Sequence, residues 1–133
     1  MDRICSRLTS LAAIVCMGSL AAAAQADPAG KWRVEFGSHA DNDGTLTLRI
    51  APEGGAPVDV ETKITSKSGA GKVAKAVRDS LKVSLGEGYH VEIDDGEDVV
   101  IKREGKTPKF EVTLASSTLT GLKVTIKKEW KKP

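Results

Sequence analysis

Two oppositely charged segments contain the side chains best suited to chemistry. The first, Glu87 to Asp98, has six carboxylates and no lysine or arginine among its twelve residues. Carboxylates gathered at a hairpin tip could hold a hard cation such as Ca²⁺. The alternative is a charged turn that keeps the tip solvated. We favour the charged turn and predict a binding surface without a metal site. Its residues are His90, Glu92, Asp94, Asp95, Glu97 and Asp98.

The second segment is basic. Residues 107–133 carry six lysines against two glutamates, and four of these lysines flank Trp130. Lysines around an aromatic ring could touch an anionic envelope surface or polymer. The alternative is a terminal strand whose lysines protect a sheet edge while the ring packs on the core. We predict a second binding surface made of Lys123, Lys127, Lys128, Trp130 and Lys131.

Other motifs fail at the positions that their chemistry requires. The sequence SKSGAGKV is similar to a P-loop, but Ser66 and Val73 stand where that motif needs Gly and a hydroxyl residue. The segment HADNDG lacks the acidic first residue and the Glu at position twelve of a calcium loop. Neither His39 nor His90 belongs to a recognisable nucleophile or metal motif. We therefore predict no catalytic residue, metal or cofactor.

The first 26 residues have the features of an export signal. Arg3 and Arg7 precede an apolar run, and an Ala-Gln-Ala sequence ends at residue 26. We predict a cleaved signal peptide at 1–26, one mature domain at 27–133 and a periplasmic or secreted location. The mature chain would carry 18 basic and 17 acidic side chains and no cysteine. This composition argues against disulfides and against nucleic-acid binding, and no later segment is apolar enough to cross a membrane.

Hydrophobic periodicity predicts the elements that position the charged residues. Within 70–85 the large apolar residues recur every four positions, which predicts an amphipathic helix that Ser68 caps and Gly86 ends. The strand patterns cover 32–36, 46–50, 58–64, 89–93, 99–101, 110–114 and 122–126. The sequence thus predicts an α+β domain, with a mostly antiparallel sheet of about seven strands and one helix between strands three and four.

The size of this predicted sheet raises the question of what covers it. A helix of about 16 residues is ~24 Å long and cannot cover seven strands that lie ~4.8 Å apart. Either the sheet curls on itself, or another chain covers part of its apolar face. The second alternative favours a protein partner.

The order of elements from Val58 to about Thr118 is strand, Gly/Ser-rich helix start, helix, Asp-Gly hairpin and a further strand. This order, with the helix sequence AGKVAKAVRDSL after a strand that ends in Ile-Thr, resembles the strand-helix-hairpin inserts of phage tail and flagellar hook-associated proteins. The resemblance implies an interaction or assembly role and brings no catalytic residues. The helix and hairpin are also similar to PepSY-type domains, extracytoplasmic modules linked in some cases to peptidase inhibition.

These observations together predict an exported, non-catalytic domain that binds a protein partner or an envelope component. Because the two predicted surfaces have opposite charges, head-to-tail association into a homo-oligomer is a specific alternative to binding another partner. Two other classes of function stay open. A small hydrolase or metal-dependent enzyme would need a pocket with a histidine beside carboxylates. An inhibitor of an extracellular hydrolase would use an exposed loop, for which Glu53–Pro57 is the nearest candidate.

Overall fold

The computed structural model describes residues 28–129, whose buried side chains form one core cluster. The predicted signal peptide at 1–26 lies outside the described residues, as do Trp130 and Lys131 of the predicted basic surface. Between residues 28 and 129, no helix combines the length and the apolar character that crossing a bilayer requires. Because one core joins all the described elements, we expect a chain of residues 27–133 to fold by itself.

Seven strands and one long helix make up the fold. In chain order they are β1 (Lys31–Ser38), β2 (Gly44–Pro52), β3 (Val58–Ile64), α2 (Ala70–Leu85), the short 3₁₀ helix η1 (Gly86–Gly88), β4 (Tyr89–Asp94), β5 (Asp98–Arg103), β6 (Phe110–Ser117) and β7 (Leu122–Lys128). All strand pairs are antiparallel. The predicted α+β class is confirmed, and so is the position of the helix between strands three and four.

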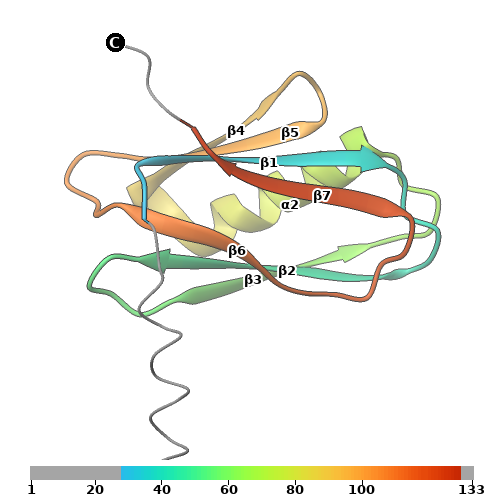
Figure 1. The fold of residues 1–133 in the computed structure, drawn as a ribbon, viewed down its shortest axis with the longest axis horizontal. Helices are drawn as coiled ribbons and strands as arrows, with labels where there is room; N and C mark the ends of the chain where they lie inside the picture. Colours follow the sequence, from blue (N-terminus) through green and yellow to red (C-terminus); the bar gives the residue numbers. More distant parts are fainter. Residues whose placement is uncertain (1–27, 130–133) are drawn as a thin grey trace, which may run out of the picture.

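The prediction of a single sheet is wrong, because the strands form two sheets. One has four strands in the order β4-β5-β1-β7, and the other has three in the order β3-β2-β6. Figure 1 shows the two sheets as separate layers, with β7 in one layer and β6 in the other. The physical reason is the burial of apolar surface, since each layer shields the apolar face of the other from water. A single flat sheet of this size would leave most of its apolar face in water.

The core lies between the two layers. Alternate residues of β1 and β2 point inward, so that Trp32, Val34 and Phe36 face a second row from β2. The layers join where β1 approaches the start of β6. There the Trp32 Nε1–H donates a hydrogen bond of 2.7 Å to the carbonyl oxygen of Phe110, and a backbone bridge links Ala29 to Phe110. The indole therefore adds both buried area and a polar link between the sheets.

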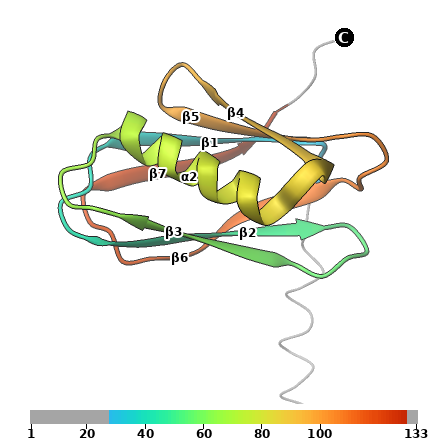
Figure 2. The same ribbon diagram turned by 180° about the vertical axis from the view of Figure 1, so that it is seen from behind.

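Helix α2 closes the side of the molecule between β3 and β4 (Figure 2). Its buried residues are Ala70, Val73, Ala74, Val77 and Leu81. Gly86 ends the helix with a φ of 69°, a conformation that favours glycine. The predicted cap at Ser68 is wrong. The N-cap is Gly69, and the buried Ser68 hydroxyl is 3.0 Å from that of Thr65.

The apolar faces of the sheets are therefore covered within this one chain. Of the two alternatives raised by the size of the sheet, the structure has a form of the first, in which two layers replace one curled sheet. Among the described residues, the exposed large apolar side chains are Val58, Val83 and Leu114. The argument for a partner from an uncovered sheet face no longer holds, so any interaction surface must be sought elsewhere.

The packing of α2 predicts opposite results for two substitutions on the same helix. Leu81 is completely buried, whereas Val83 is 86% exposed. Leu81→Asp places a charge in the core, at a cost comparable with the whole stability of a small domain, about 5 to 15 kcal/mol. We expect this variant to lose its cooperative melting transition in circular dichroism. Val83→Asp, the control, should change stability by only about 0.5 kcal/mol. A Leu81→Asp variant that melts cooperatively would contradict this packing.

Candidate functional site

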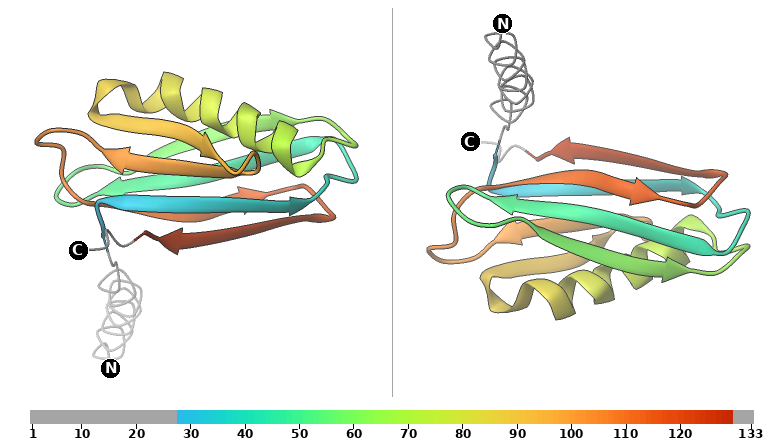
Figure 3. Two further views of the ribbon diagram at one scale, coloured as in Figure 1. Left: turned by 90° about the horizontal axis from the view of Figure 1, so that it is seen from above. Right: turned by 90° about the horizontal axis from the view of Figure 1, so that it is seen from below.

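The candidate site is the surface of the four-stranded sheet that points away from the core. Because the side chains of a strand alternate, the residues between the buried positions of β1, β4, β5 and β7 share this surface. Figure 3 shows α2 alongside the β4 edge of this sheet. We call this surface the outer face. Its side chains are Lys31, Arg33, Glu35, His90, Glu92, Asp94, Asp98, Val100, Lys102, Lys123, Thr125 and Lys127.

Strand register arranges the charges of the outer face in rows. One row contains only carboxylates from three neighbouring strands, because Asp98 lies opposite both Asp94 and Glu35. Another row brings Lys102 opposite Lys31. Like charges directly across from one another repel, so each row alone would destabilise the sheet. The row between them must therefore supply the compensation, in the form of charges that offset this repulsion.

Arg33 on β1 provides that compensation. One guanidinium nitrogen, Nη1, donates a hydrogen bond of 2.8 Å to Asp98. The other, Nη2, donates to Asp94 at 2.6 Å and to Glu129 at 3.0 Å. The Arg33 side chain is only 16% exposed. It therefore links the β4–β5 hairpin to the residue after β7 through a largely covered, charge-assisted network.

The electrostatics of this cluster follow from the same contacts. The hydrogen bonds that Arg33 donates to Glu129 and Asp94 raise the pKa of Arg33 above its ordinary value, so this side chain stays charged. The hydrogen bond from Arg33 holds the pKa of Asp94 below its ordinary value. Beneath the charged network, Val100 is 2% exposed although it belongs to the outer face. Arg33 and Glu92 are its partners in register on either side.

Further polar contacts hold the ends of the outer face. Lys127 Nζ is 3.1 Å from Glu35 Oε1, which ties β7 to β1. His90 Nε2 lies 3.4 Å from Glu92, and its Nδ1 lies 3.8 Å from Glu104. The charged side chains of this face are thus positioned by one another and by the sheet.

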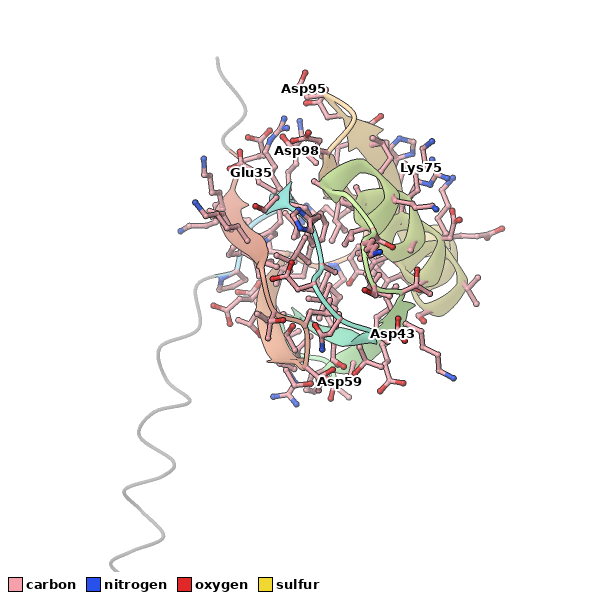
Figure 4. The ribbon with its side chains drawn as sticks, turned by 90° about the vertical axis from the view of Figure 1, so that its right-hand side faces the viewer. Glu35, Asp43, Asp59, Lys75, Asp95 and Asp98 are labelled. Atoms are coloured by element: carbon pink, nitrogen blue, oxygen red, sulfur yellow. The ribbon has the colours of Figure 1, made fainter. Side chains whose placement is uncertain are left out.

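The structure places parts of the two predicted surfaces on the same face of the four-stranded sheet. From the acidic set, His90, Glu92, Asp94 and Asp98 lie on the outer face, while Asp95 and Glu97 belong to the hairpin turn. From the basic set, Lys123 and Lys127 lie on the same face at its other edge, and Lys128 is half-buried with the opposite orientation. Figure 4 shows Asp98 and Glu35 near one another and Asp95 at the hairpin tip.

Two residues central to this face were not singled out from the sequence. Arg33 and Glu35 alternate with the apolar residues of the first strand pattern, so their outward direction was readable from periodicity. Their role was not readable, because it depends on β1 lying between β5 and β7. The pairing partners of β1 are more than 60 residues away in the sequence.

Other segments considered in the sequence analysis have structural contacts. The HADNDG segment is a turn in which Asn42 accepts a hydrogen bond from the Thr120 amide at 2.8 Å and donates one to the Thr118 carbonyl at 2.9 Å. The Glu53–Pro57 loop is the exposed turn between β2 and β3. Between α2 and β3 lies a shallow, open depression that Glu61, Asp79, Ser80, Val83 and Ser84 line.

The cation alternative for the acidic hairpin finds no ligand set in the described part of the chain. Among residues 28–129 there is no group of three or more His, Cys, Asp or Glu side chains arranged to hold a metal ion. Asp94 and Asp98 instead share the guanidinium of Arg33. Their oxygens are used to stabilise the sheet.

Comparison with known proteins adds no relative. No protein-family model matches the chain, and no curated protein is significantly similar to it. The order of strand, helix, hairpin and further strand from Val58 to about Thr118 is present in the structure as β3, α2, β4, β5 and β6. Its resemblance to the phage and flagellar inserts and to PepSY-type domains therefore concerns the order of elements alone.

The Arg33 network predicts that Arg33→Gln destabilises the domain more than a comparable change elsewhere. The substitution leaves three carboxylates without their shared cation, and we expect the free energy of unfolding to fall by roughly 1 to 3 kcal/mol. Arg49→Gln is the control, because the Arg49–Asp59 pair has both side chains 48% exposed. Urea denaturation measures both variants. Equal losses would show that the network contributes no more than an exposed ion pair.

The lowered pKa of Asp94 predicts how stability depends on pH. The folded-state pKa lies below the ordinary 3.8 that we take for the unfolded chain. The ionised Asp94 therefore stabilises the fold above about pH 4, and this contribution is lost as pH falls through the folded-state pKa. Asp59, held by Arg49, follows the same direction and adds to the loss in the wild type.

We therefore expect Asp94→Asn to be less stable than the wild type near neutral pH, with a difference that shrinks in acid. Urea denaturation between about pH 2 and pH 7 measures this difference. In an Arg33→Gln background, Asp94→Asn should have little further effect, because the interaction is already lost. A difference that stays constant across this pH range would contradict the role of the Asp94 carboxylate.

Proposed function

We propose that this chain is an exported, non-catalytic interaction domain whose outer face engages a protein partner or an envelope component. The observation that carries the proposal is the ordered array of charges on that face. Its central arginine is mostly covered and bound to three carboxylates. Lys123 and Lys127 lie at the β7 edge of this face, and Glu92 and Asp94 lie at the β4 edge. The face thus has both a fixed geometry and a charge pattern.

Such an array suits recognition for two physical reasons. Charged side chains that are already held by ion pairs lose less conformational freedom when a partner binds. A surface with positive charge at one edge and negative charge at the other selects partners by orientation as well as by charge, and it accelerates encounter at low salt. The predicted export signal supports a periplasmic or secreted place of action.

The partner that fits this face is one with a complementary charge pattern, not one with a uniform charge. Lys123 and Lys127 at the β7 edge would attract carboxylates or other anions. Glu92 and Asp94 at the β4 edge would attract basic groups. A protein surface can supply both in one contact, and an anionic envelope polymer could engage the β7 edge alone.

The proposal is tested by a pull-down from the native envelope fraction with variants that keep the net charge unchanged. The test variant, Glu92→Lys with Lys123→Glu, reverses one charge at each edge of the outer face. The control, Glu61→Lys with Lys63→Glu, makes the same exchange on exposed residues of β3 in the other sheet. Both variants should match the wild type in folded structure, as checked by circular dichroism.

We expect the wild type and the control to recover the same stoichiometric component. The test variant should recover about tenfold less, since a loss of about 1.4 kcal/mol in binding corresponds to that factor. Equal recovery by all three proteins, or recovery of no specific component by the wild type, would contradict an interaction role for the outer face.

A further inference from the structure

β7 is the least covered strand of this fold. Among the described residues it is the only strand without a buried member, because its seven residues alternate between partly exposed and exposed. It lies at one end of the order β4-β5-β1-β7 and pairs with β1. Figure 3 shows β7 at the margin of the molecule opposite α2.

The other outer strands of the two sheets are covered, at least in part. Helix α2 packs along β4, where Val91 is only 3% exposed, and along β3 in the second sheet. In β6, Phe110 and Val112 are buried, and Ala29 forms a backbone bridge to Phe110. An outer strand can bind a further strand only where its backbone is accessible. In this fold, β7 meets that condition along its whole length.

The backbone hydrogen bonds show which groups β7 presents to a further strand. The amide of Glu129 donates to the carbonyl of Lys31 at 3.0 Å, so Glu129 bonds toward β1. In an antiparallel ladder this direction alternates along the strand. The odd-numbered residues of β7 therefore bond toward β1, whereas the amides and carbonyls of Val124 and Ile126 point away from it.

The same edge carries apolar side chains that the second sheet covers incompletely. Leu122, Val124 and Ile126 point to the core side of the sheet and pack against the core cluster. All three are partly exposed, whereas Val34 and Phe36 on the neighbouring strand β1 are 0% and 3% exposed. A strand added beside β7 would remove more of this apolar surface from water.

A second copy of β7 fits this edge in direction and in charge. A two-fold axis perpendicular to the sheet brings two β7 strands together antiparallel, which continues the pattern of the sheet. If the axis passes through Ile126, Lys123 of each copy lies opposite Glu129 of the other. Thr125 then lies opposite Lys127. Opposite charges directly across a strand pair are favourable, and the symmetry forms the pair of Lys123 with Glu129 twice.

The neighbouring registers match less well. An axis through Thr125 sets Lys123 opposite Lys127, and like charges in that position repel. An axis through Val124 sets Lys123 opposite Thr125 and forms no ion pair. The charges of β7 therefore favour the axis through Ile126.

We propose that two copies of this chain associate through their β7 strands about a two-fold axis at Ile126, so that their four-stranded sheets become one continuous sheet. The inference goes beyond the proposed function, because the contact uses the strand edge and leaves the outer face open. The two outer faces become one surface, with the β7 lysines near its centre and the β4 carboxylates at both ends. Unlike a head-to-tail chain, a two-fold contact uses the same edge in both copies and ends at a dimer.

Introduced cysteines test the contact and its register, because residues 27–133 contain none. Lys123→Cys, Thr125→Cys and Lys127→Cys each place one thiol on the outer side of β7. With the axis at Ile126, positions 125 and 127 of the two copies face each other with about 4.5 Å between their Cα atoms, a distance that a disulfide spans. We expect a mixture of Thr125→Cys and Lys127→Cys to form a disulfide-linked dimer under mild oxidation. Each variant alone should stay monomeric in non-reducing electrophoresis.

Other cross-links would overturn this register. Thr125→Cys linked to itself would indicate an axis at Thr125, and a link between Lys123→Cys and Thr125→Cys would indicate an axis at Val124. The dimer itself would be overturned if none of these variants or mixtures is cross-linked and the wild type sediments as a monomer at low salt.

A proline substitution tests whether the β7 backbone forms the contact. Because the amide of Val124 points away from β1, Val124→Pro removes no hydrogen bond within one copy. We expect this variant to melt cooperatively and to sediment as a monomer at a protein concentration at which the wild type is a dimer. Thr125→Pro, the control, removes an amide that bonds toward β1 and should lower the melting temperature. A folded Val124→Pro variant that dimerises as well as the wild type would contradict pairing through β7.

A charge reversal tests the pairing of Lys123 with Glu129. Lys123→Glu sets two carboxylates opposite each other at both symmetric positions, so we expect the dissociation constant of the dimer to rise about tenfold, which corresponds to about 1.4 kcal/mol. Lys63→Glu makes the same change in net charge on β3 and should leave dimerisation unchanged. Equal effects of the two variants in sedimentation velocity would contradict a specific role of Lys123.

The dimer and the proposed function can fail separately. A monomeric wild type that still recovers an envelope component in the pull-down would overturn the dimer and support the proposed function. A dimeric wild type that recovers no component would support the dimer and contradict the binding role of the outer face.

Discussion

β1 is the element on which both layers of this protein depend, because its two faces serve different environments. Its inward side chains, Trp32, Val34 and Phe36, help to form the core and connect the two sheets through the indole hydrogen bond to β6. Its outward side chains, Arg33 and Glu35, join β4, β5 and β7 by ion pairs. β1 lies between β5 and β7, two strands that come much later in the chain. It therefore joins the N-terminal and C-terminal parts of the sequence in one sheet.

The use of two layers explains how a small domain can contain so much sheet. One helix covers only the side between β3 and β4, and the sheets cover each other. The apolar surface is thereby removed from water within a single chain. Among residues 28–129, Val58, Val83 and Leu114 are the exposed large apolar side chains, so directional contacts and charge would decide a partner of this surface.

The charged residues of the outer face divide between a role in the fold and the proposed role in binding. Arg33 neutralises the carboxylates nearest to the centre of the outer face, and this stabilises the sheet. Glu92 and Lys123 lie farther out, at opposite edges of the same sheet. The centre is thus committed to the fold, while the edges keep a charge pattern that a partner could recognise.

Local patterns in the sequence determined the helix at 70–85, the strand segments, the α+β class and the outward direction of the charged residues, because these properties depend on neighbours a few positions apart. Tertiary structure alone decided that the strands divide into two sheets and that β1 separates β5 from β7. It also decided that Asp94 and Asp98 meet Arg33, over 60 positions earlier in the chain. Such contacts depend on which strands pair, and pairing follows from how the whole chain buries its apolar surface, which no single segment encodes.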